Sequence, residues 1–208
     1  MESYQKQIMP AKDRFLKKQI NFLLFGILFF IILFSKISIG EEIKYKVANY
    51  VKNLNSFSSK FIQSNGASLE EGNIYIKDAK IRLDYFYPDR SLIVGKKKGV
   101  YINHELKEES FFSTDNNIVK LFSDVFLDYN FFSSLMFKEN NHEVIFEKTI
   151  LVDSKKTNLK IYFENKPLLL RKIIAKTENE IISISFSEHN YNGAFEESLF
   201  SFVPIYLD

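Results

Sequence analysis

The sequence contains no cysteine and no tryptophan, and its 208 residues include only seven glycines and three histidines. Without cysteine the chain cannot form disulfides, bind metal through thiolates or carry a lipid on a cysteine at a processing site. His104, His142 and His189 are scattered without the close spacing of a metal site, and the glycines form no phosphate-binding loop. We therefore expect no metal and no cofactor.

Groups that could do covalent chemistry are also missing. There is no G-x-S-x-G motif, and the single S-x-x-K, from Ser3 to Lys6, precedes the apolar segment described below. Adjacent carboxylates point to opposite faces of a strand, so they indicate solvated turns and edges. These pairs are Glu70-Glu71, Glu108-Glu109 and Glu196-Glu197. The sequence predicts a protein that is not an enzyme.

The first 40 residues have the pattern of an export signal. Lys17 and Lys18 precede an apolar run over residues 20–34, and Ser38 and Gly40 are small residues placed for signal-peptidase cleavage before Glu41. The alternative is a retained inner-membrane anchor, because the uncharged run between the flanking lysines has nearly the length that a membrane span needs. In both cases basic residues keep the N-terminal end in the cytoplasm and residues 41–208 are exported.

The charge of the chain is divided in the same way. Residues 1–40 hold six Lys or Arg and two Asp or Glu, which leaves 22 basic and 24 acidic groups in the exported part. That balance gives no indication of nucleic-acid binding. Lys96 to Lys98 is the one dense basic run, and we interpret it as a solvated hairpin tip. The alternative is a docking point for an acidic partner or anionic headgroups.

The exported part shows strand patterns with two helical interruptions. Apolar residues at helical spacing predict a first helix over residues 41–54 and one or two short helices within residues 110–137. Asn65-Gly66 lies between two alternating runs and predicts a tight hairpin. Later strands are expected at residues 142–148, 149–153, 158–164, 168–176, 181–188 and 199–203.

The most informative stretch is residues 57–94, where apolar residues alternate with polar ones at the period of half-buried strands. The residues predicted to share one apolar face are Phe57, Phe61, Ile74, Ile76, Ile81, Leu83 and Tyr85. Strands, a helical insert and further strands indicate an antiparallel α+β domain. The pattern alone fits either a packed core or a ligand cavity, and packed cores are the commoner case.

The same stretch resembles a known family. Its motifs are F-x-x-x-F-x-Q at residues 57–63, G-x-I-x-I-K at 72–77, K-I-R-L-D-Y at 80–85 and P-x-x-x-L-I-V at 88–94, with LKIYF at 159–163 and F-x-P at 202–204. Together they are similar to the periplasmic carriers of outer-membrane lipoproteins, the LolA family. The resemblance covers most of residues 41–208.

That resemblance implies a specific architecture and function. The fold would be a curved antiparallel sheet forming an unclosed β-barrel, covered by the N-terminal helix and the internal helical insert. Its seven apolar residues would line a cavity for the acyl chains of lipoproteins. The protein would be a periplasmic monomer that accepts acylated lipoproteins from a lipoprotein-releasing transporter of the inner membrane and passes them to an outer-membrane acceptor.

One departure from the family concerns the lid. Family members commonly carry an Arg-Pro pair before the K-x-R-x-D-Y strand, and that arginine is implied to hold the lid by hydrogen bonding. Lys77 and Asp78 stand at those positions here. Lysine keeps the charge but lacks the planar fork of donors, so we expect Lys77 to hold the lid less firmly. An alternative function is a membrane-anchored accessory module of the same fold that binds another lipid or a partner protein.

Overall fold

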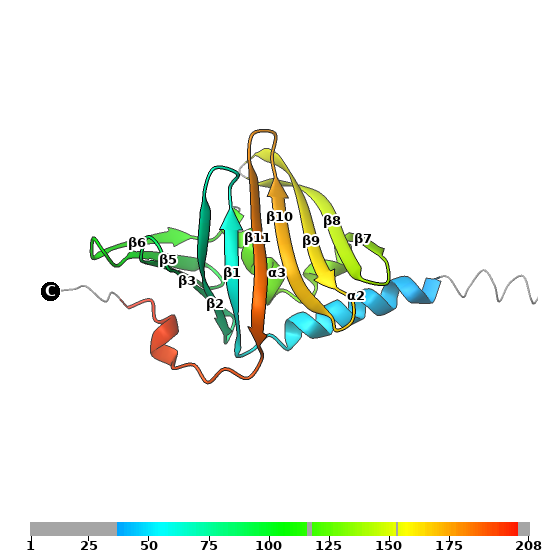
Figure 1. Ribbon diagram of the computed structural model, residues 1–208, viewed down its shortest axis with the longest axis horizontal. Coiled ribbons are helices and arrows are strands. Elements are labelled where there is room, and N and C mark those ends of the chain that lie inside the picture. The colour runs from blue at the N-terminus through cyan, green and yellow to red at the C-terminus, as the bar shows by residue number, and fades with distance from the viewer. Residues whose placement is uncertain (1–36, 116–117, 153, 204–208) are drawn as a thin grey trace, which may run out of the picture. The chain divides into compact units, whose positions relative to one another are not determined.

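The computed structural model describes residues 37–115, 118–152 and 154–203 (Figure 1). Two compact units, residues 1–45 and 46–208, make up the chain, and the fold below is that of the second unit. The apolar run at residues 20–34 lies outside the described residues, so cleavage before Glu41 stays a prediction. In the described ranges no helix is both long and apolar enough to cross a membrane.

Eleven antiparallel strands form one curved, open sheet, which confirms the predicted fold class (Figure 1). The spatial order is β6-β5-β4-β3-β2-β1-β11-β10-β9-β8-β7, so the pairing of β1 with β11 joins two halves. The first half comprises β1 (Phe57–Ser64), β2 (Leu69–Lys77), β3 (Lys80–Tyr85), β4 (Arg90–Val94), β5 (Lys98–Asn103) and β6 (Glu108–Ser113). The second comprises β7 (Met136–Glu139), β8 (Glu143–Val152), β9 (Lys155–Glu164), β10 (Leu169–Lys176) and β11 (Ile181–Asn190).

The predicted hairpin at Asn65-Gly66 joins β1 to β2. Gly66 has φ +90°, a conformation that side chains rarely adopt. The Asn65 side-chain oxygen accepts hydrogen bonds from the backbone N–H groups of Ala67 and Ser68, at 3.0 and 2.8 Å. Local turn chemistry therefore fixes the register of this pair of strands, as the sequence predicts.

The order of the strands in the sheet determines where the helical insert lies. It contains α3 (Ile118–Leu127) and the 3₁₀ helix η1 (Phe131–Ser134), and it connects β6 to β7. These two strands are the opposite edges of the sheet. The connection must therefore cross one face of the sheet, which we call the inner face. In Figure 1, α3 lies within the curve of the strands.

Aromatic side chains fill the inner face of the second half. The Phe132 ring of η1 packs edge-on against Phe146 and Phe163, with ring centroids 5.1 and 5.6 Å apart. Tyr50, near the end of α2 (Ile37–Lys52), contacts Phe163 from another side, and its hydroxyl accepts the backbone N–H of Leu170 at 3.2 Å. Both η1 and the end of α2 are thus docked on the sheet by rings.

The prediction of a last strand over residues 199–203 was wrong. A 3₁₀ helix, η2 (Glu197–Phe200), and irregular backbone stand there instead. Side chains of the outer face take the carbonyls that a strand would use: Arg82 donates to Leu199 at 2.8 Å and Lys80 to Phe200 at 3.4 Å. Residues 194–203, called the C-terminal segment below, therefore lie across the outer face.

Candidate functional site

The seven residues predicted from the alternating pattern are brought together on the inner face. Strand register places Phe57 beside Ile76 and Ile76 beside Ile81, while Ile74 lies beside Leu83. Phe61 and Tyr85 flank Gly72, and their rings meet edge-to-face 5.1 Å apart. All seven are at most 9% exposed. They form packed core in this structure, and their contact with a ligand stays a prediction.

Gly72 is what permits the contact of Phe61 with Tyr85. A Cβ atom at this position would lie 2.0 Å from the backbone oxygen of Asp84 and 2.8 Å from the Phe61 ring. Only glycine leaves room for the ring to lie across the strand. The glycine in the G-x-I-x-I-K motif is therefore explained by packing on the inner face.

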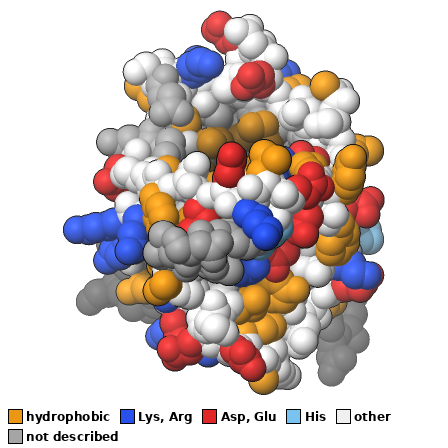
Figure 2. All heavy atoms as spheres, turned by 90° about the vertical axis from the view of Figure 1, so that its left-hand side faces the viewer, with side chains coloured by type: hydrophobic (Ala, Val, Ile, Leu, Met, Phe, Trp, Pro, Cys, Tyr) orange, Lys and Arg blue, Asp and Glu red, His pale blue; other side chains and the backbone are white. Residues whose placement is uncertain are grey.

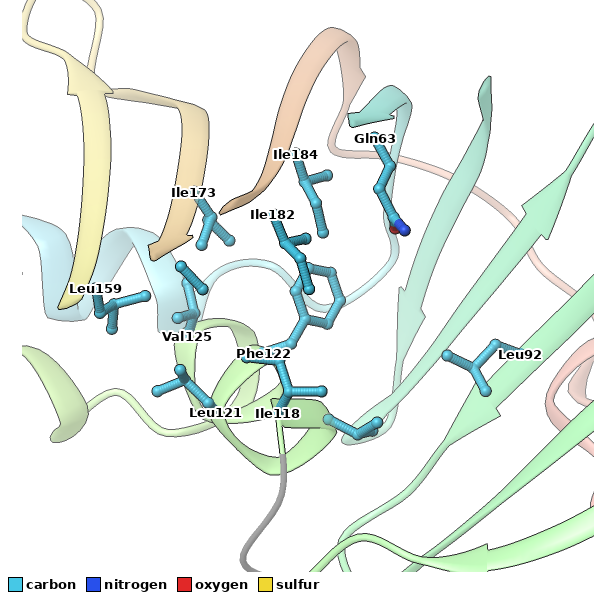
Figure 3. A pocket seen from close by; sticks show the side chains of 12 residues that line it. Gln63, Leu92, Ile118, Leu121, Phe122, Val125, Leu159, Ile173, Ile182 and Ile184 are labelled. Atoms are coloured by element: carbon cyan, nitrogen blue, oxygen red, sulfur yellow. The ribbon is translucent and has the colours of Figure 1, made fainter. Parts of the chain in front are cut away.

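A pocket of about 180 Å³ lies on the inner face, beneath α3 (Figure 3). Its residues come from α3, from β9 to β11, and from β1 and β4 across the curve of the sheet. The lining consists of Gln63, Leu92, Ile118, Val119, Leu121, Phe122, Val125, Leu159, Ile173, Ala175, Ile182 and Ile184. Gln63 is the only polar side chain among them.

None of the seven predicted cavity residues lines this pocket. The predicted apolar face lies within residues 57–94, whereas most of the pocket lining comes from α3 and from β9 to β11. A signal for the helix side was present, because Ile118, Leu121, Phe122 and Val125 recur at helical spacing. For the strand side, the alternation of apolar and polar residues over 159–184 predicts an apolar face. It does not predict which part of that face the helical insert leaves uncovered.

Apolar contacts connect α3 to the sheet. Leu121, Val125 and Phe126 are buried, and the Phe126 ring packs edge-on against Phe186 of β11, with centroids 5.6 Å apart. The ion pair of Lys120 with Asp124, at 2.8 Å, lies within the helix. Contacts of this kind can be replaced by those of an apolar ligand without leaving a buried polar group unpaired.

A second hollow, of about 410 Å³, lies at the other end of α3. Its polar lining residues are Lys52, Asn55 and Asp78, and the others are Val51, Leu54, Ile76, Ala79, Phe126, Leu127 and Tyr129. Ile76, one of the seven predicted cavity residues, thus borders this second hollow. Phe126 lines this hollow and its neighbour Val125 lines the pocket, so the last turn of α3 borders both.

Four side chains form a polar cluster beside the pocket. The Tyr85 hydroxyl donates to Gln63 Oε1 at 3.1 Å, and Gln63 Nε2 lies 3.5 Å from Glu70 Oε2. Arg90 forms an ion pair with Glu70 at 2.7 Å and stacks its guanidinium 4.3 Å from the centre of the Tyr85 ring. Burial raises the pKa of Tyr85 to about 12, so its hydroxyl stays a donor at neutral pH.

Lys77 has its contact on the C-terminal segment. Its ammonium donates to the backbone oxygen of Phe195 at 2.8 Å, on the outer side of the sheet from α3. A role for Lys77 in holding the lid stays a prediction. The next two residues, Asp78 and Ala79, have φ +48° and +57°, which makes the β2–β3 connection a turn that proline cannot enter. A proline at position 78 could not adopt this backbone conformation.

The outer face of the first half is covered by the C-terminal segment. Phe202 packs on a buried cluster of Ile93, Val100 and Ile102, and Lys98 lies 5.1 Å from the centre of its ring. Lys96 to Lys98 are exposed at the turn between β4 and β5, as expected of a hairpin tip. Figure 2 shows acidic, basic and hydrophobic side chains interspersed on this side of the molecule.

Two of the three histidines make contacts within the sheet. His189 Nε2 lies 2.7 Å from the backbone oxygen of Leu170, and burial lowers the pKa of His189. His104 Nε2 lies 2.8 Å from the Ser91 hydroxyl. Among the residues that the structure describes, no group of three or more His, Cys, Asp or Glu is placed to hold a metal ion.

Comparisons with known proteins give a fold and no family. No family model and no curated protein matches the sequence. An uncharacterized conserved protein from Thermus thermophilus matches in structure with a TM-score of 0.51 at 8% identity, over 78% of this chain and 94% of that one. At such low identity the match shows a shared fold alone.

Two further matches are weaker. The structure of MucB matches with a TM-score of 0.44 at 12% identity, over 77% of this chain and 64% of MucB. A complex of MucA and MucB from Pseudomonas aeruginosa gives 0.43 and 12%, over 74% and 60%. The chain thus spans less than two thirds of the MucB chains that it matches. The resemblance to the lipoprotein carriers still rests on the sequence motifs.

Proposed function

We propose that residues 41–208 form a periplasmic carrier that holds the acyl chains of lipoproteins and works by binding, without catalysis. The observation that carries the proposal is the apolar pocket on the inner face, which is lined on one side by α3, a helix with buried apolar side chains. Exposing an acyl chain to water costs about 0.8 kcal/mol per CH₂ group, so a chain gains by entering such a pocket. Transfer to an acceptor then requires only moderate affinity.

The size of the pocket indicates that α3 must move. An apolar cavity of about 150 Å³ holds a molecule the size of benzene, and sites for larger ligands measure about 300–1,000 Å³. At about 180 Å³ the pocket takes only part of an acyl chain while α3 is in place. Ligand binding would therefore favour a state in which α3 is displaced.

Displacement of α3 would make the predicted cavity residues accessible to a ligand. Phe126 packs on Phe186, whose register partner in β1 is Phe61, and it shares the second hollow with Ile76. Moving Phe126 outward would connect the pocket with that hollow and expose this part of the core. The seven residues would then line the enlarged cavity.

Neighbouring residues on opposite faces of β11 offer a matched test. Ile182 lines the pocket, whereas Ile181 is 46% exposed and does not. We expect Ile182→Glu to weaken binding of a fluorescent acylated peptide at least about tenfold, because the charge would have to be buried beside the acyl chain. Ile181→Glu should bind as the unchanged protein does, and circular dichroism should show both folded.

Equal binding by the two variants, or no binding by the unchanged protein, would refute the carrier function. If Ile182→Glu fails to fold, Ile182→Ser places a smaller polar group at the same point and should weaken binding in the same direction.

The alternative of an anchored accessory module is favoured by one observation. Helix α2 begins at Ile37 and runs through Ser38 and Gly40, the residues of the expected cleavage site. Proteases cut extended backbone, so a helix there favours retention of the preceding segment. N-terminal sequencing of the exported protein separates the two: a start at Glu41 supports the shuttle, and an uncut chain found only in membranes supports the anchored module.

A further inference from the structure

Gln63 is the one polar side chain among the lining residues of the pocket, and its neighbours fix it in place. Figure 3 shows its side chain reaching into the pocket from β1. Its Oε1 accepts from Tyr85 and its Nε2 lies at the limit of hydrogen bonding to Glu70. A primary amide has two donor hydrogens and two acceptor lone pairs, so these contacts use half of its capacity.

The amide therefore sits at an apolar cavity with hydrogen-bonding capacity to spare. Gln63 is half-buried. A ligand that excludes water from the pocket would leave this capacity unused unless one of its groups accepts from Nε2. The neighbours preorganise the amide, because Tyr85 is held by Arg90 and by Phe61, and Glu70 is held by Arg90. A ligand would find the donor already oriented.

The charge around Gln63 selects the kind of acceptor. Arg90 and Glu70 form an ion pair at 2.7 Å and neutralise each other, so the cluster offers no net positive charge to an anion. A carboxylate would also lie near the carboxylate of Glu70. A neutral carbonyl oxygen meets neither difficulty.

We propose that Gln63 recognises the neutral ester or amide carbonyl at the head of an acyl chain, and so fixes which end of the chain lies at β1. This inference rests on the proposed function. The chain would run from Gln63 beneath α3 toward Leu159 and Ile173 of the second half. The ligand is then an ester- or amide-linked acyl group, and neither a free fatty acid nor a plain hydrocarbon is equivalent to it.

Displacement of a bound apolar dye by three probes tests this assignment. Methyl laurate, sodium laurate and dodecane share a chain but differ in the head. We expect methyl laurate to displace the dye at about 3- to 10-fold lower concentration than dodecane, the ratio that one net hydrogen bond supplies. Sodium laurate should displace the dye only at a higher concentration than methyl laurate.

Gln63→Leu, which keeps the size of the side chain, should bring the ratio of methyl laurate to dodecane close to one without weakening dodecane. Since this change leaves the Tyr85 hydroxyl without an acceptor, Gln63→Leu combined with Tyr85→Phe serves as a second variant. Ile62→Leu is the control, because Ile62 is the adjacent residue in β1 and is 46% exposed. It should keep the preference.

The outcomes separate the two proposals. A preference for methyl laurate that disappears in the Gln63 variants supports the assignment. Equal potency of the three probes, a preference for laurate, or a preference that survives Gln63→Leu overturns it while leaving the carrier function in place. Failure of every probe to displace the dye from the unchanged protein overturns both.

Discussion

Two segments cover the sheet from opposite sides, and different forces hold them. On the inner face, α3 contributes buried apolar side chains such as Val125 and Phe126. On the outer face, the C-terminal segment accepts hydrogen bonds from three cationic side chains. Lys77, Lys80 and Arg82 donate to the backbone oxygens of Phe195, Phe200 and Leu199.

The difference separates a displaceable cover from a fixed one. An acyl chain can replace the apolar contacts of α3, because both partners are hydrocarbon. It cannot replace charged donors that each need a carbonyl in a defined place. Under the proposed function, α3 would be displaced from the inner face by a ligand, whereas the C-terminal segment would stay in place on the outer face.

The largest expected effect is at Arg82, the central tie of the C-terminal segment. Besides Leu199 it contacts Asp84 at 2.7 Å and Ser91 at 2.9 Å, and its side chain is only 12% exposed. We expect Arg82→Met to lower the free energy of unfolding by about 2–4 kcal/mol, because Asp84 would keep the Ser91 hydroxyl but lose its guanidinium partner. Urea denaturation measures the change.

Lys60→Met provides the control for that measurement. Lys60 and Glu188 form an ion pair with both side chains more than half exposed, so its loss should cost less than about 1 kcal/mol. Similar losses in the two variants would show that the outer-face ties are no stronger than ordinary surface pairs.

Hydrogen exchange should reveal the next largest difference. Amides of α3 should open at a free energy at least about 2 kcal/mol below that of amides in β1 and β11, since buried apolar side chains such as Val125 and Phe126 hold the helix. A saturating concentration of an acyl probe should change the hydrogen-exchange rates of amides in α3 but not those of amides in the C-terminal segment on the outer face. Protection of α3 equal to that of the central strands would contradict its role as a displaceable cover.

A smaller effect concerns the end of α2, a third cover, whose Tyr50 shares Leu170 with His189. Burial lowers the pKa of His189 from 6.5, so the folded state binds a proton less readily than the unfolded chain. Stability is full above this value and is lost as pH falls through it toward the lowered pKa. The urea concentration at the unfolding midpoint should therefore decrease as the pH is lowered from neutral to pH 5. His189→Gln should make this dependence on pH weaker.

The smallest effect is expected at Lys77. With its hydrogen bond on the C-terminal segment, Lys77→Met should cost about 0.5–1 kcal/mol of stability and leave binding of an apolar dye unchanged. If the lysine instead held the lid, as the family resemblance implies, Lys77→Arg would reduce dye binding relative to the unchanged protein. Comparing the three proteins at matched concentration decides which face Lys77 serves.

The sequence predicted the sheet better than its covers. Alternation in residues 57–94 was sufficient to place Phe61 and Leu83 on one face, because the period of a strand is local. Asn65-Gly66 predicted its hairpin for the same reason. The strand expected at residues 199–203 was wrong because Lys80 and Arg82, distant in sequence, take the carbonyls of that segment.

The pocket could not be located from sequence for a related reason. Which part of the inner face stays open depends on where the insert crosses it, and that follows from the strand order β6 to β7 rather than from any local pattern. Alternation marks Ile173 and Ile184 as inward-facing equally with Ile161 and Phe163. Only the position of α3 distinguishes lining from core.

The insert joins the two free edges of the sheet, and this gives it a mechanical role. A segment attached to both edge strands limits how far these strands can move apart. Three residues, 128–130, separate α3 from η1. In the proposed carrier, lengthening this connection would let the edges spread further and admit a larger cargo without altering a strand.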